Sequence, residues 1–296
     1  MQKLPDSVRL EEGQGKLRRL AIKTAQADAE IYLHGAHVTQ FQPKDQKPVL
    51  FMSEKSMFEA GKPIRGGVPI CFPWFGARQD GQPGPAHGFA RLMEWELVSA
   101  EQESDGVVEV RLRLVSNEAT RAMWHGEFEA EYRVRIGSTL GLELHVKNTG
   151  SQPLRIEEAL HTYLAVGDVR QVGIEGLAGA TYSTIVPAPR TETESAAPIR
   201  ITAETDRIYF NTQATCVVHD PGWQRKLAVK KTGSDATVVW NPWIAKAKAM
   251  PDFGDDEWPH MLCIETCNVR ENAITLTPGQ SHAMFAVIRA GKSSVE

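Results

Sequence analysis

Residues 128–146, FEAEYRVRIGSTLGLELHV, decide the fold class of this chain. Apolar residues occupy every second position from Phe128 to Ile136, and Glu or Arg fills the positions between them. A similar alternation runs from Leu140 to Val146, after a three-residue connection that contains Gly137. A period of two is typical of a strand with one buried face, and a short connection with a glycine is typical of a hairpin. These residues therefore predict two antiparallel neighbours in a sheet with one apolar face.

Other short runs extend this pattern along the chain. Further candidate strands are Val108 to Leu114, Leu17 to Lys23, Ala29 to Leu33, Val38 to Phe41 and Ala283 to Arg289. Helical periodicity is scarce, although residues 55–60 and 117–123 could each form a turn or two. Many short strands joined by loops rich in glycine and proline predict an all-β fold, a large antiparallel β-sandwich with few short helices.

Nothing in the composition divides the chain. It has 296 residues, 42% of them hydrophobic, which is enough for a sizeable core. No Ser/Gly linker, charge block or repeat of fixed period interrupts the sequence, so we expect residues 1–296 to form a single domain. Residues 187–198, rich in Pro, Thr, Glu and Ala, are the best candidate for a flexible connection. We interpret them as a surface loop rather than a domain boundary, because strand-like sequence resumes at Ile199.

Charge and cysteine content narrow the classes of function. The net charge of -4 argues against a nucleic-acid or anionic-membrane partner, whereas a small polar or anionic ligand remains compatible with it. Residues 1–10 contain no apolar run of signal-peptide length, and no segment is long enough to cross a bilayer. Four cysteines are too few for a disulfide scaffold. We expect a cytoplasmic protein.

The stretch Cys263-Ile264-Glu265-Thr266-Cys267 contains the first candidate for chemistry. It places one carboxylate in a run of small, apolar and β-branched residues, where a charge is costly unless it is paired or used. Glu265 is therefore a candidate functional residue. The alternative is a glutamate on the solvated face of an edge strand.

Two loops add cations and histidine. Residues 63–76, PIRGGVPICFPWFG, are dense in Gly, Pro and aromatic residues and contain a single cation, Arg65. An arginine offers a planar fork of donors to a phosphate or carboxylate, although a structural loop would have the same composition. Residues 87–91, HGFAR, add His87 and Arg91, which alone carry little information.

Three further segments are weaker candidates. In EALHTYL, residues 158–164, His161 lies on the mixed face of a predicted strand and could simply be satisfied by a neighbour. The segment WNPW, residues 240–243, and the acidic residues 252–258 resemble a lid that leads into the Glu265 strand. Asp206 could be a turn residue.

Several chemistries lack support in the sequence. In an extended strand Cys263 and Cys267 would lie about 13 Å apart, which is too far to share a zinc ion, so we expect no metal site. No Gly-x-Ser-x-Gly elbow indicates a serine hydrolase. No glycine-rich loop indicates a nucleotide.

Five segments in this order, PIRGGVPICFPWFG, HGFAR, EALHTYL, WNPW and MLCIETCNV, resemble the D-hexose-6-phosphate mutarotase (glucose-6-phosphate 1-epimerase) branch of the aldose 1-epimerase superfamily. The resemblance spans nearly the whole chain, from Gly35 to Gly279. It implies a galactose-mutarotase-like sandwich that interconverts the α and β anomers of a hexose 6-phosphate without a cofactor. A monomer is slightly favoured.

The resemblance also implies roles for individual residues. His161 and Glu265 would be the catalytic pair, and Arg65, Arg91 and Asp206 would contact the sugar phosphate. His87 would line the site. One departure is Ala86, where the family pattern has glutamine, which leaves the preferred hexose open.

Anomer exchange requires one base and one acid at the same pH. We hypothesise that Glu265 removes the proton of the hemiacetal O1 while His161 protonates the ring oxygen O5. This predicts a carboxylate at its ordinary pKa and a histidine whose pKa is held up by nearby negative charge. Two alternatives stay open: a mutarotase for free aldoses, and a carbohydrate-binding protein without catalysis.

Overall fold

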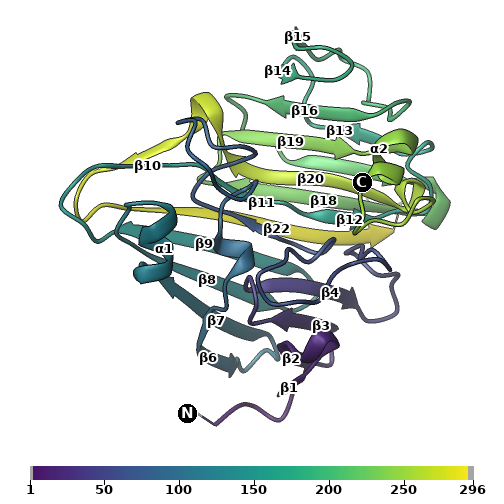
Figure 1. Cartoon of the computed structure of the whole chain (residues 1–296). Helices are drawn as coiled ribbons and strands as arrows, with labels where there is room; N and C mark the ends of the chain where they lie inside the picture. The colour runs from purple at the N-terminus through teal and green to yellow at the C-terminus, as the bar shows by residue number, and fades with distance from the viewer. Residues whose placement is uncertain (1–2, 293–296) are drawn as a thin grey trace.

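Strands dominate the computed structural model, which describes residues 3–292 (Figure 1). The described part contains two α-helices, α1 (Glu118–Met123) and α2 (Trp243–Ala249). Five single-turn 3-10 segments are η1 (Gln14–Lys16), η2 (Ala90–Leu92), η3 (Pro221–Trp223), η4 (Trp258–His260) and η5 (Arg270–Asn272). The predicted all-β class with few short helices is confirmed.

One eight-stranded sheet, which we call the long sheet, contains the hairpin predicted from residues 128–146. Its strand order is β13-β17-β18-β22-β9-β8-β7-β6. These strands are β6 (Glu96–Gln102), β7 (Val108–Val115), β8 (Phe128–Ile136), β9 (Leu140–Asn148), β13 (Gly173–Glu175), β17 (Cys216–Asp220), β18 (Arg225–Thr232) and β22 (Ser281–Lys292). Ile136 lies opposite Leu140 at the turn between β8 and β9, as the alternation predicts.

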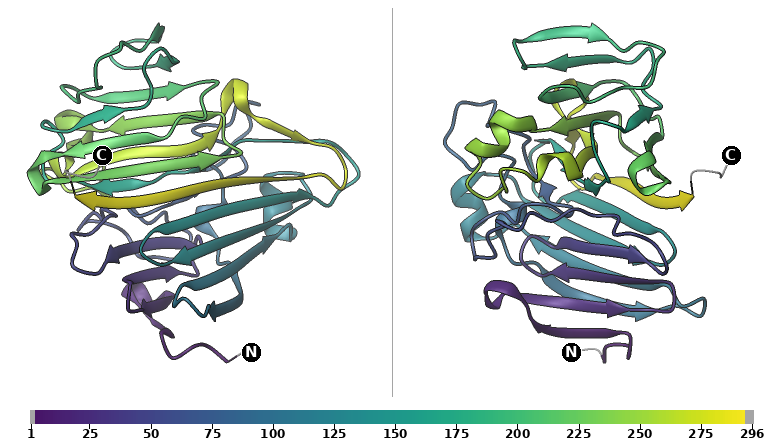
Figure 2. Two further views of the ribbon diagram at one scale, coloured as in Figure 1. Left: turned by 180° about the vertical axis from the view of Figure 1, so that it is seen from behind. Right: turned by 90° about the vertical axis from the view of Figure 1, so that its right-hand side faces the viewer.

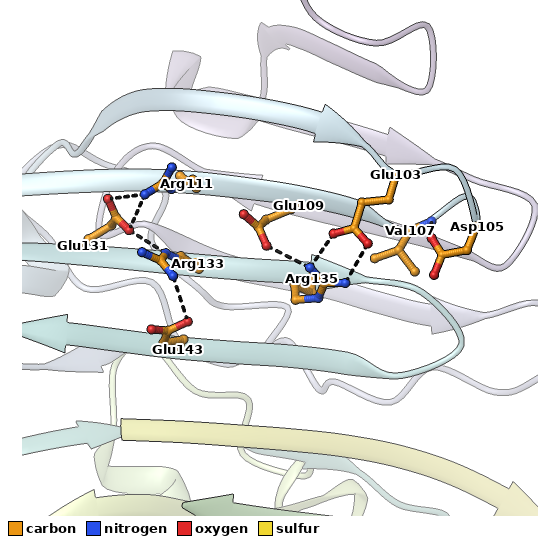
Figure 3. Close-up of polar contacts among 9 residues, drawn as sticks. All are labelled: Glu103, Asp105, Val107, Glu109, Arg111, Glu131, Arg133, Arg135 and Glu143. Atoms are coloured by element: carbon orange, nitrogen blue, oxygen red, sulfur yellow. Dashed lines mark hydrogen bonds and ion pairs between the residues drawn. The ribbon is translucent and has the colours of Figure 1, made fainter. Parts of the chain in front are cut away.

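The alternating charges of β7, β8 and β9 form an ion-pair network on one face of the long sheet (Figure 3). Arg111 donates to both carboxylate oxygens of Glu131, at 3.0 and 3.1 Å. Arg135 donates to Glu109 at 2.9 Å and also to Glu103. The apolar residues between these charges are buried, so the period of two separates a solvated face from a core face.

A second eight-stranded sheet, which we call the site sheet, has the order β15-β14-β16-β19-β20-β11-β5, with β12 also paired to β20. Its strands are β5 (Ile70–Cys71), β11 (Glu158–Leu160), β12 (Tyr163–Ala165), β14 (Thr181–Thr184), β15 (Arg190–Thr193), β16 (Thr205–Tyr209), β19 (Ala236–Asn241) and β20 (Met261–Asn268). All eight residues of β20 are buried, because strands pair with it on both edges.

Two smaller sheets complete the fold. One has the order β1-β2-β3-β4, with β1 (Val8–Glu12), β2 (Arg18–Lys23), β3 (Ala27–Tyr32) and β4 (His37–Pro43). The other pairs β10 (Leu154–Ile156) with β21 (Ile274–Leu276).

The long sheet extends along the site sheet and the β1 to β4 sheet, and the three form a layered sandwich (Figures 1 and 2). Buried side chains from all three sheets join in one hydrophobic cluster. Burial of this apolar surface is the main favourable contribution to folding.

Two local predictions differ from the structure. Residues 55–60 form no helix, because the carboxylate of Glu257 accepts from the backbone N–H of Glu54 at 2.7 Å and Phe58 packs on the ring of Tyr32. Residues 187–198 are not wholly a loop, since they contain the edge strand β15. All four residues of β15 are exposed, so it lacks the apolar face that would reveal a strand in the sequence. In residues 3–292 no helix has the length and apolar character needed to span a membrane.

Candidate active site

A cavity of about 730 Å³ opens over one face of the site sheet. Cavities of this size are typical of small-molecule sites. Five of the six side chains predicted from the sequence line it: Arg65, His87, His161, Asp206 and Glu265. The structure therefore brings together residues from two loops and two strands of the site sheet, β16 and β20, with His161 between two short strands.

Glu265 projects from the middle of β20. Val238 of β19 lies opposite Glu265 in the strand register. The side chain of Glu265 is only 1% exposed. The alternative of a glutamate on a solvated edge strand is therefore wrong. Glu265 thus extends its carboxyl group from a central strand into the cavity, and the neighbouring strands shield the rest of its side chain from water.

His161 occupies a break between β11 and β12 rather than a continuous strand. Its backbone N–H donates to the carbonyl of Pro69 at 3.0 Å, and Thr162 N–H turns back to the carbonyl of Leu160 at 2.8 Å. The predicted strand alternation fails here because this local turn replaces ladder bonds. The imidazole stacks on the ring of Tyr163, with centroids 4.8 Å apart and an interplanar angle of 10°.

His161 and Glu265 meet at the base of the cavity. Nε2 of His161 lies 3.3 Å from Oε1 of Glu265. Nδ1 of His161 and Oε2 of Glu265 are buried and have no hydrogen-bond partner among the described residues. Buried polar atoms are usually hydrogen-bonded, so an unpartnered atom on each of two neighbouring side chains in a cavity indicates a place where a ligand supplies the missing partners.

Burial sets the protonation of this pair. Desolvation raises the pKa of Glu265 well above its ordinary value, and the nearby carboxyl group of Asp206 raises it further. Desolvation lowers the pKa of His161 well below its ordinary value, and His87 with the two arginines Arg65 and Arg91 lowers it further. Both shifts run opposite to the expectation of a carboxylate with an ordinary pKa beside a histidine whose pKa is held up. The directions of both shifts favour a neutral pair.

His87 is a fixed neutral imidazole on the cavity wall. The backbone N–H of Gly76 donates to its Nδ1 at 3.3 Å, which leaves Nε2 to carry the hydrogen. Burial and nearby arginines lower its pKa to about 3. The ring packs edge-on against Phe75 and His161, with centroids 4.7 and 5.6 Å away.

Arg65 is held by two partners at the cavity wall. Its Nε and Nη2 donate to Asp252 at 3.2 and 3.0 Å, and Nη1 donates to the hydroxyl of Tyr163 at 2.8 Å. The two following glycines let this loop cross β4 closely. Gly67 has φ +58°, and a Cβ there would lie 2.2 Å from the carbonyl oxygen of Val38. The glycines of this segment therefore serve packing, while Arg65 faces the cavity.

Arg91 lies in η2 and is not among the residues that line the cavity. It is 7% exposed, its Nη2 donates to the carbonyl of Ala86 at 2.8 Å, and its Nε has no partner among the described residues. Because that contact uses the backbone of residue 86, the change from glutamine to Ala86 leaves it intact. The expected direct contact between Arg91 and substrate stays a prediction.

Two cations that line the cavity were missed by the sequence reasoning. Lys246 extends from α2 and donates to Glu204 at 3.1 Å. Arg270 begins η5, and its Nη1 donates to the carbonyl of Phe75 at 3.0 Å and lies beside the carboxylate of Glu157. Burial raises the pKa of Asp206 above its ordinary value, and the charges of these two cations oppose that rise. Their closeness to the WNPW and MLCIETCNV segments was the available signal.

The WNPW segment and the residues after it contribute to the cavity wall. Trp240 and Met250 line it, whereas Trp243 and Trp258 pack on each other with ring centroids 4.2 Å apart. Glu257 accepts from the hydroxyl of Ser53 at 2.6 Å and from the backbone N–H of Gly254 at 2.7 Å. The acidic residues of this segment thus serve anchoring, in addition to Asp252 at Arg65.

Comparison with known proteins agrees with this geometry. Residues 18–289 match the family model described as aldose 1-epimerase. The chain belongs to the aldose 1-epimerase family. A relative from Cenchrus ciliaris, 36% identical over 262 residues that make up 85% of this chain and 78% of that protein, is named "putative glucose-6-phosphate 1-epimerase". A relative from Escherichia coli K12 with the same name is 34% identical over 260 residues, 86% of this chain and 85% of that protein.

A solved structure of a family relative is also similar. The crystal structure of the "putative mutarotase" YeaD from Salmonella typhimurium superposes with a TM-score of 0.90 at 30% sequence identity. The match covers 99% of this chain and 96% of YeaD. The predicted galactose-mutarotase-like sandwich and membership of this isomerase family are therefore confirmed.

Proposed function

We propose that the protein interconverts the α and β anomers of a hexose 6-phosphate by opening and reclosing the sugar ring. One observation carries this proposal: His161 and Glu265 meet at 3.3 Å in the cavity, and each keeps one buried polar atom unpartnered. A base and an acid at one point are what the reaction requires. The names of the curated relatives support the choice of a hexose phosphate as substrate.

The chemistry needs only one proton in the pair. For ring opening, the Glu265 carboxylate takes the O1 proton of the hemiacetal, and the His161 imidazolium gives a proton to O5 as the C1–O5 bond breaks. The products are the open-chain aldehyde, a neutral Glu265 and a neutral His161. The C1 carbon then rotates about the C1–C2 bond, and the reverse proton transfers close the ring on its other face.

The neutral pair favoured by burial is the state that accompanies the open-chain aldehyde. Transfer of the proton from Glu265 to His161, across their 3.3 Å contact, gives the ionised pair that starts ring opening. We therefore infer that the buried environment stabilises the intermediate state of the site relative to its starting state.

The remaining walls suit a sugar. We propose that the carboxyl group of Asp206 and Nε2 of His87 hydrogen-bond hydroxyl groups, since both residues line the cavity. Trp240 and Phe75 provide flat apolar surfaces against which a sugar ring can lie.

The cations explain recognition of a phosphate. We propose that Lys246 and Arg270 hold it together with Arg65, because charge-assisted hydrogen bonds are the strong ones available for a dianion. Each guanidinium nitrogen of Arg65 already donates to one protein partner, which leaves one N–H on Nη1 and one on Nη2 for a phosphate. In the described part of the chain, only Nη1 of the Arg270 guanidinium group has hydrogen-bond partners, so Nη2 is better placed to donate to a phosphate. Arg91 keeps its proposed contact only if substrate binding moves it.

NMR exchange spectroscopy tests the proposal. The protein should accelerate exchange between the α and β anomers of glucose 6-phosphate much more than exchange between those of glucose. Equal acceleration of both would favour a free-aldose mutarotase. Saturable binding without acceleration would favour a carbohydrate-binding protein and contradict the proposal.

We further propose that the protein acts as a monomer in the cytoplasm, without a nucleic-acid or membrane partner. All four cysteines are free, as expected of a reducing compartment. Size-exclusion chromatography with light scattering should give the mass of one chain.

A further inference from the structure

Cys263 lies beside the proposed catalytic pair and has no part in the proposed reaction. Its Sγ, a ring nitrogen of His161 and a carboxylate oxygen of Glu265 all lie within 4.8 Å of one another. Cys263 and Glu265 are two positions apart on β20, so their side chains leave the strand on the same face. We propose that these three residues bind a thiophilic divalent cation such as Zn²⁺, which blocks the site.

The donor atoms are close to the spacing of a zinc site. Bonds of tetrahedral zinc to nitrogen and oxygen place those two ligand atoms about 3.3 Å apart. Nε2 of His161 and Oε1 of Glu265 are 3.3 Å apart. In a tetrahedral site, a zinc-bound sulfur lies about 3.5 Å from the nitrogen and oxygen ligands. Sγ of Cys263 lies within 4.8 Å of both, so it needs to approach them by at most about 1.3 Å.

Charge also favours the ion. A deprotonated Cys263 and a deprotonated Glu265 supply two negative charges, which cancel those of a divalent cation. The side chains of these three residues are almost completely buried. An uncompensated charge would be costly there, and a neutral assembly of ion and ligands avoids that cost. The ion displaces the protons of both groups, so its affinity should rise with pH.

The ligand set selects among metals. Thiolate and imidazole favour Zn²⁺ and Co²⁺, whereas Mg²⁺ and Ca²⁺ prefer oxygen ligands alone. His161 and Glu265 line the cavity, so an ion can enter from that side. Three protein ligands leave a fourth position open for water. The spacing argument that excluded zinc from Cys263 and Cys267 does not apply, because here the partners of Cys263 are Glu265, two positions away on the same face of β20, and His161 from across the sheet.

Co²⁺ is the probe, since its spectrum reports thiolate ligation without any assay of activity. Reduced wild-type protein titrated with Co²⁺ should show a thiolate-to-cobalt charge-transfer band in the near ultraviolet. Cys263→Ser should lose this charge-transfer band. His161→Ala should lose the visible bands of tetrahedral cobalt. Cys267→Ser, which changes the same residue type on the same strand, should keep both, and Mg²⁺ should not displace the cobalt.

Absence of a thiolate band in the wild type, or its survival in Cys263→Ser, overturns the proposal. If Cys263→Ser does not fold, X-ray absorption of the zinc-loaded wild type decides: one sulfur at about 2.3 Å is expected, and none or two would overturn it. These readouts stand whether or not the protein is an epimerase. If the proposed function also holds, Zn²⁺ should inhibit anomer exchange and a chelator should restore it.

Discussion

Nε2 of His161 lies 3.3 Å from Oε1 of Glu265, although the two residues come from the middle and the end of the chain. The site sheet creates this contact, because β11 and β12 both pair with β20. His161 sits at the break between those two short strands and faces the carboxyl group of their shared neighbour. The proposed acid and base are thus positioned by backbone pairing rather than by flexible loops, which favours precise geometry.

Lys246→Met should weaken the binding of glucose 6-phosphate much more than the binding of glucose. A charge-assisted hydrogen bond contributes about 1.5–3 kcal/mol, so KM for the phosphorylated sugar should rise about 10- to 100-fold. Steady-state kinetics on both sugars measure this. Lys248→Met is the matched control, since Lys248 is an exposed lysine on the same helix and does not line the cavity. Equal losses on both sugars would argue against a phosphate contact by Lys246.

Arg91→Met distinguishes a direct from an indirect role. Because Arg91 is buried outside the cavity lining, we expect it to act through the charge it places near the catalytic pair, and therefore to change kcat similarly for both sugars. Kinetics on glucose 6-phosphate and glucose check this. A rise in KM confined to the phosphorylated sugar would instead support the substrate contact that the family resemblance implies.

The pH profile of kcat/KM should follow the one-proton state of the pair. A second proton binds below the lowered pKa of His161, and the last proton leaves above the raised pKa of Glu265, so activity should fall on both sides of a plateau that includes neutral pH. Asp206 raises the pKa of Glu265, so Asp206→Asn should move the alkaline limb to lower pH. An unmoved alkaline limb would contradict this electrostatic coupling.

Glu257→Ala should destabilise the fold. Its carboxylate accepts from Ser53, from the backbone N–H of Glu54 and from that of Gly254, and joins two loops that are distant in sequence. Loss of hydrogen bonds to a charged group should reduce the free energy of unfolding by about 1.5–3 kcal/mol. Urea unfolding measures it, and the exposed neighbour Asp256→Ala serves as a control. Similar effects of the two substitutions would show that Glu257 has no special anchoring role.

We propose that the chain folds as one domain, since buried residues of all three larger sheets join in a single cluster. Calorimetry should then show one cooperative transition whose calorimetric and van't Hoff enthalpies agree. Two resolved transitions would indicate separate units.

Much of the fold was predictable because it depends on local alternation. Apolar residues occupy every second position in residues 128–136 and again in residues 140–146, and these two runs form the β8 and β9 hairpin in the predicted register. Edge strand β15 was not predictable, because it is exposed on both faces and its sequence has no apolar period. Helix α2 follows Pro242 directly and has only seven residues, so its sequence is too short to show a clear helical period.

The site was predictable only in part. Glu265 could be singled out because a carboxylate in an apolar run is costly, and family resemblance pointed to His161, Arg65, His87 and Asp206. The protonation of the pair could not be predicted, since it depends on burial and on charges from distant segments. The group formed by Cys263 with His161 and Glu265 was missed because spacing along one strand does not reveal a neighbour across the sheet, here His161.

The most direct test of the central claim is anomer exchange of glucose 6-phosphate in the variants Glu265→Gln and His161→Ala, followed by NMR beside the wild type. Each substitution removes one positioned proton carrier, so each should slow exchange by about two to four orders of magnitude while the fold, checked by circular dichroism, stays intact. Exchange near the wild-type rate in either folded variant would contradict catalysis by this pair.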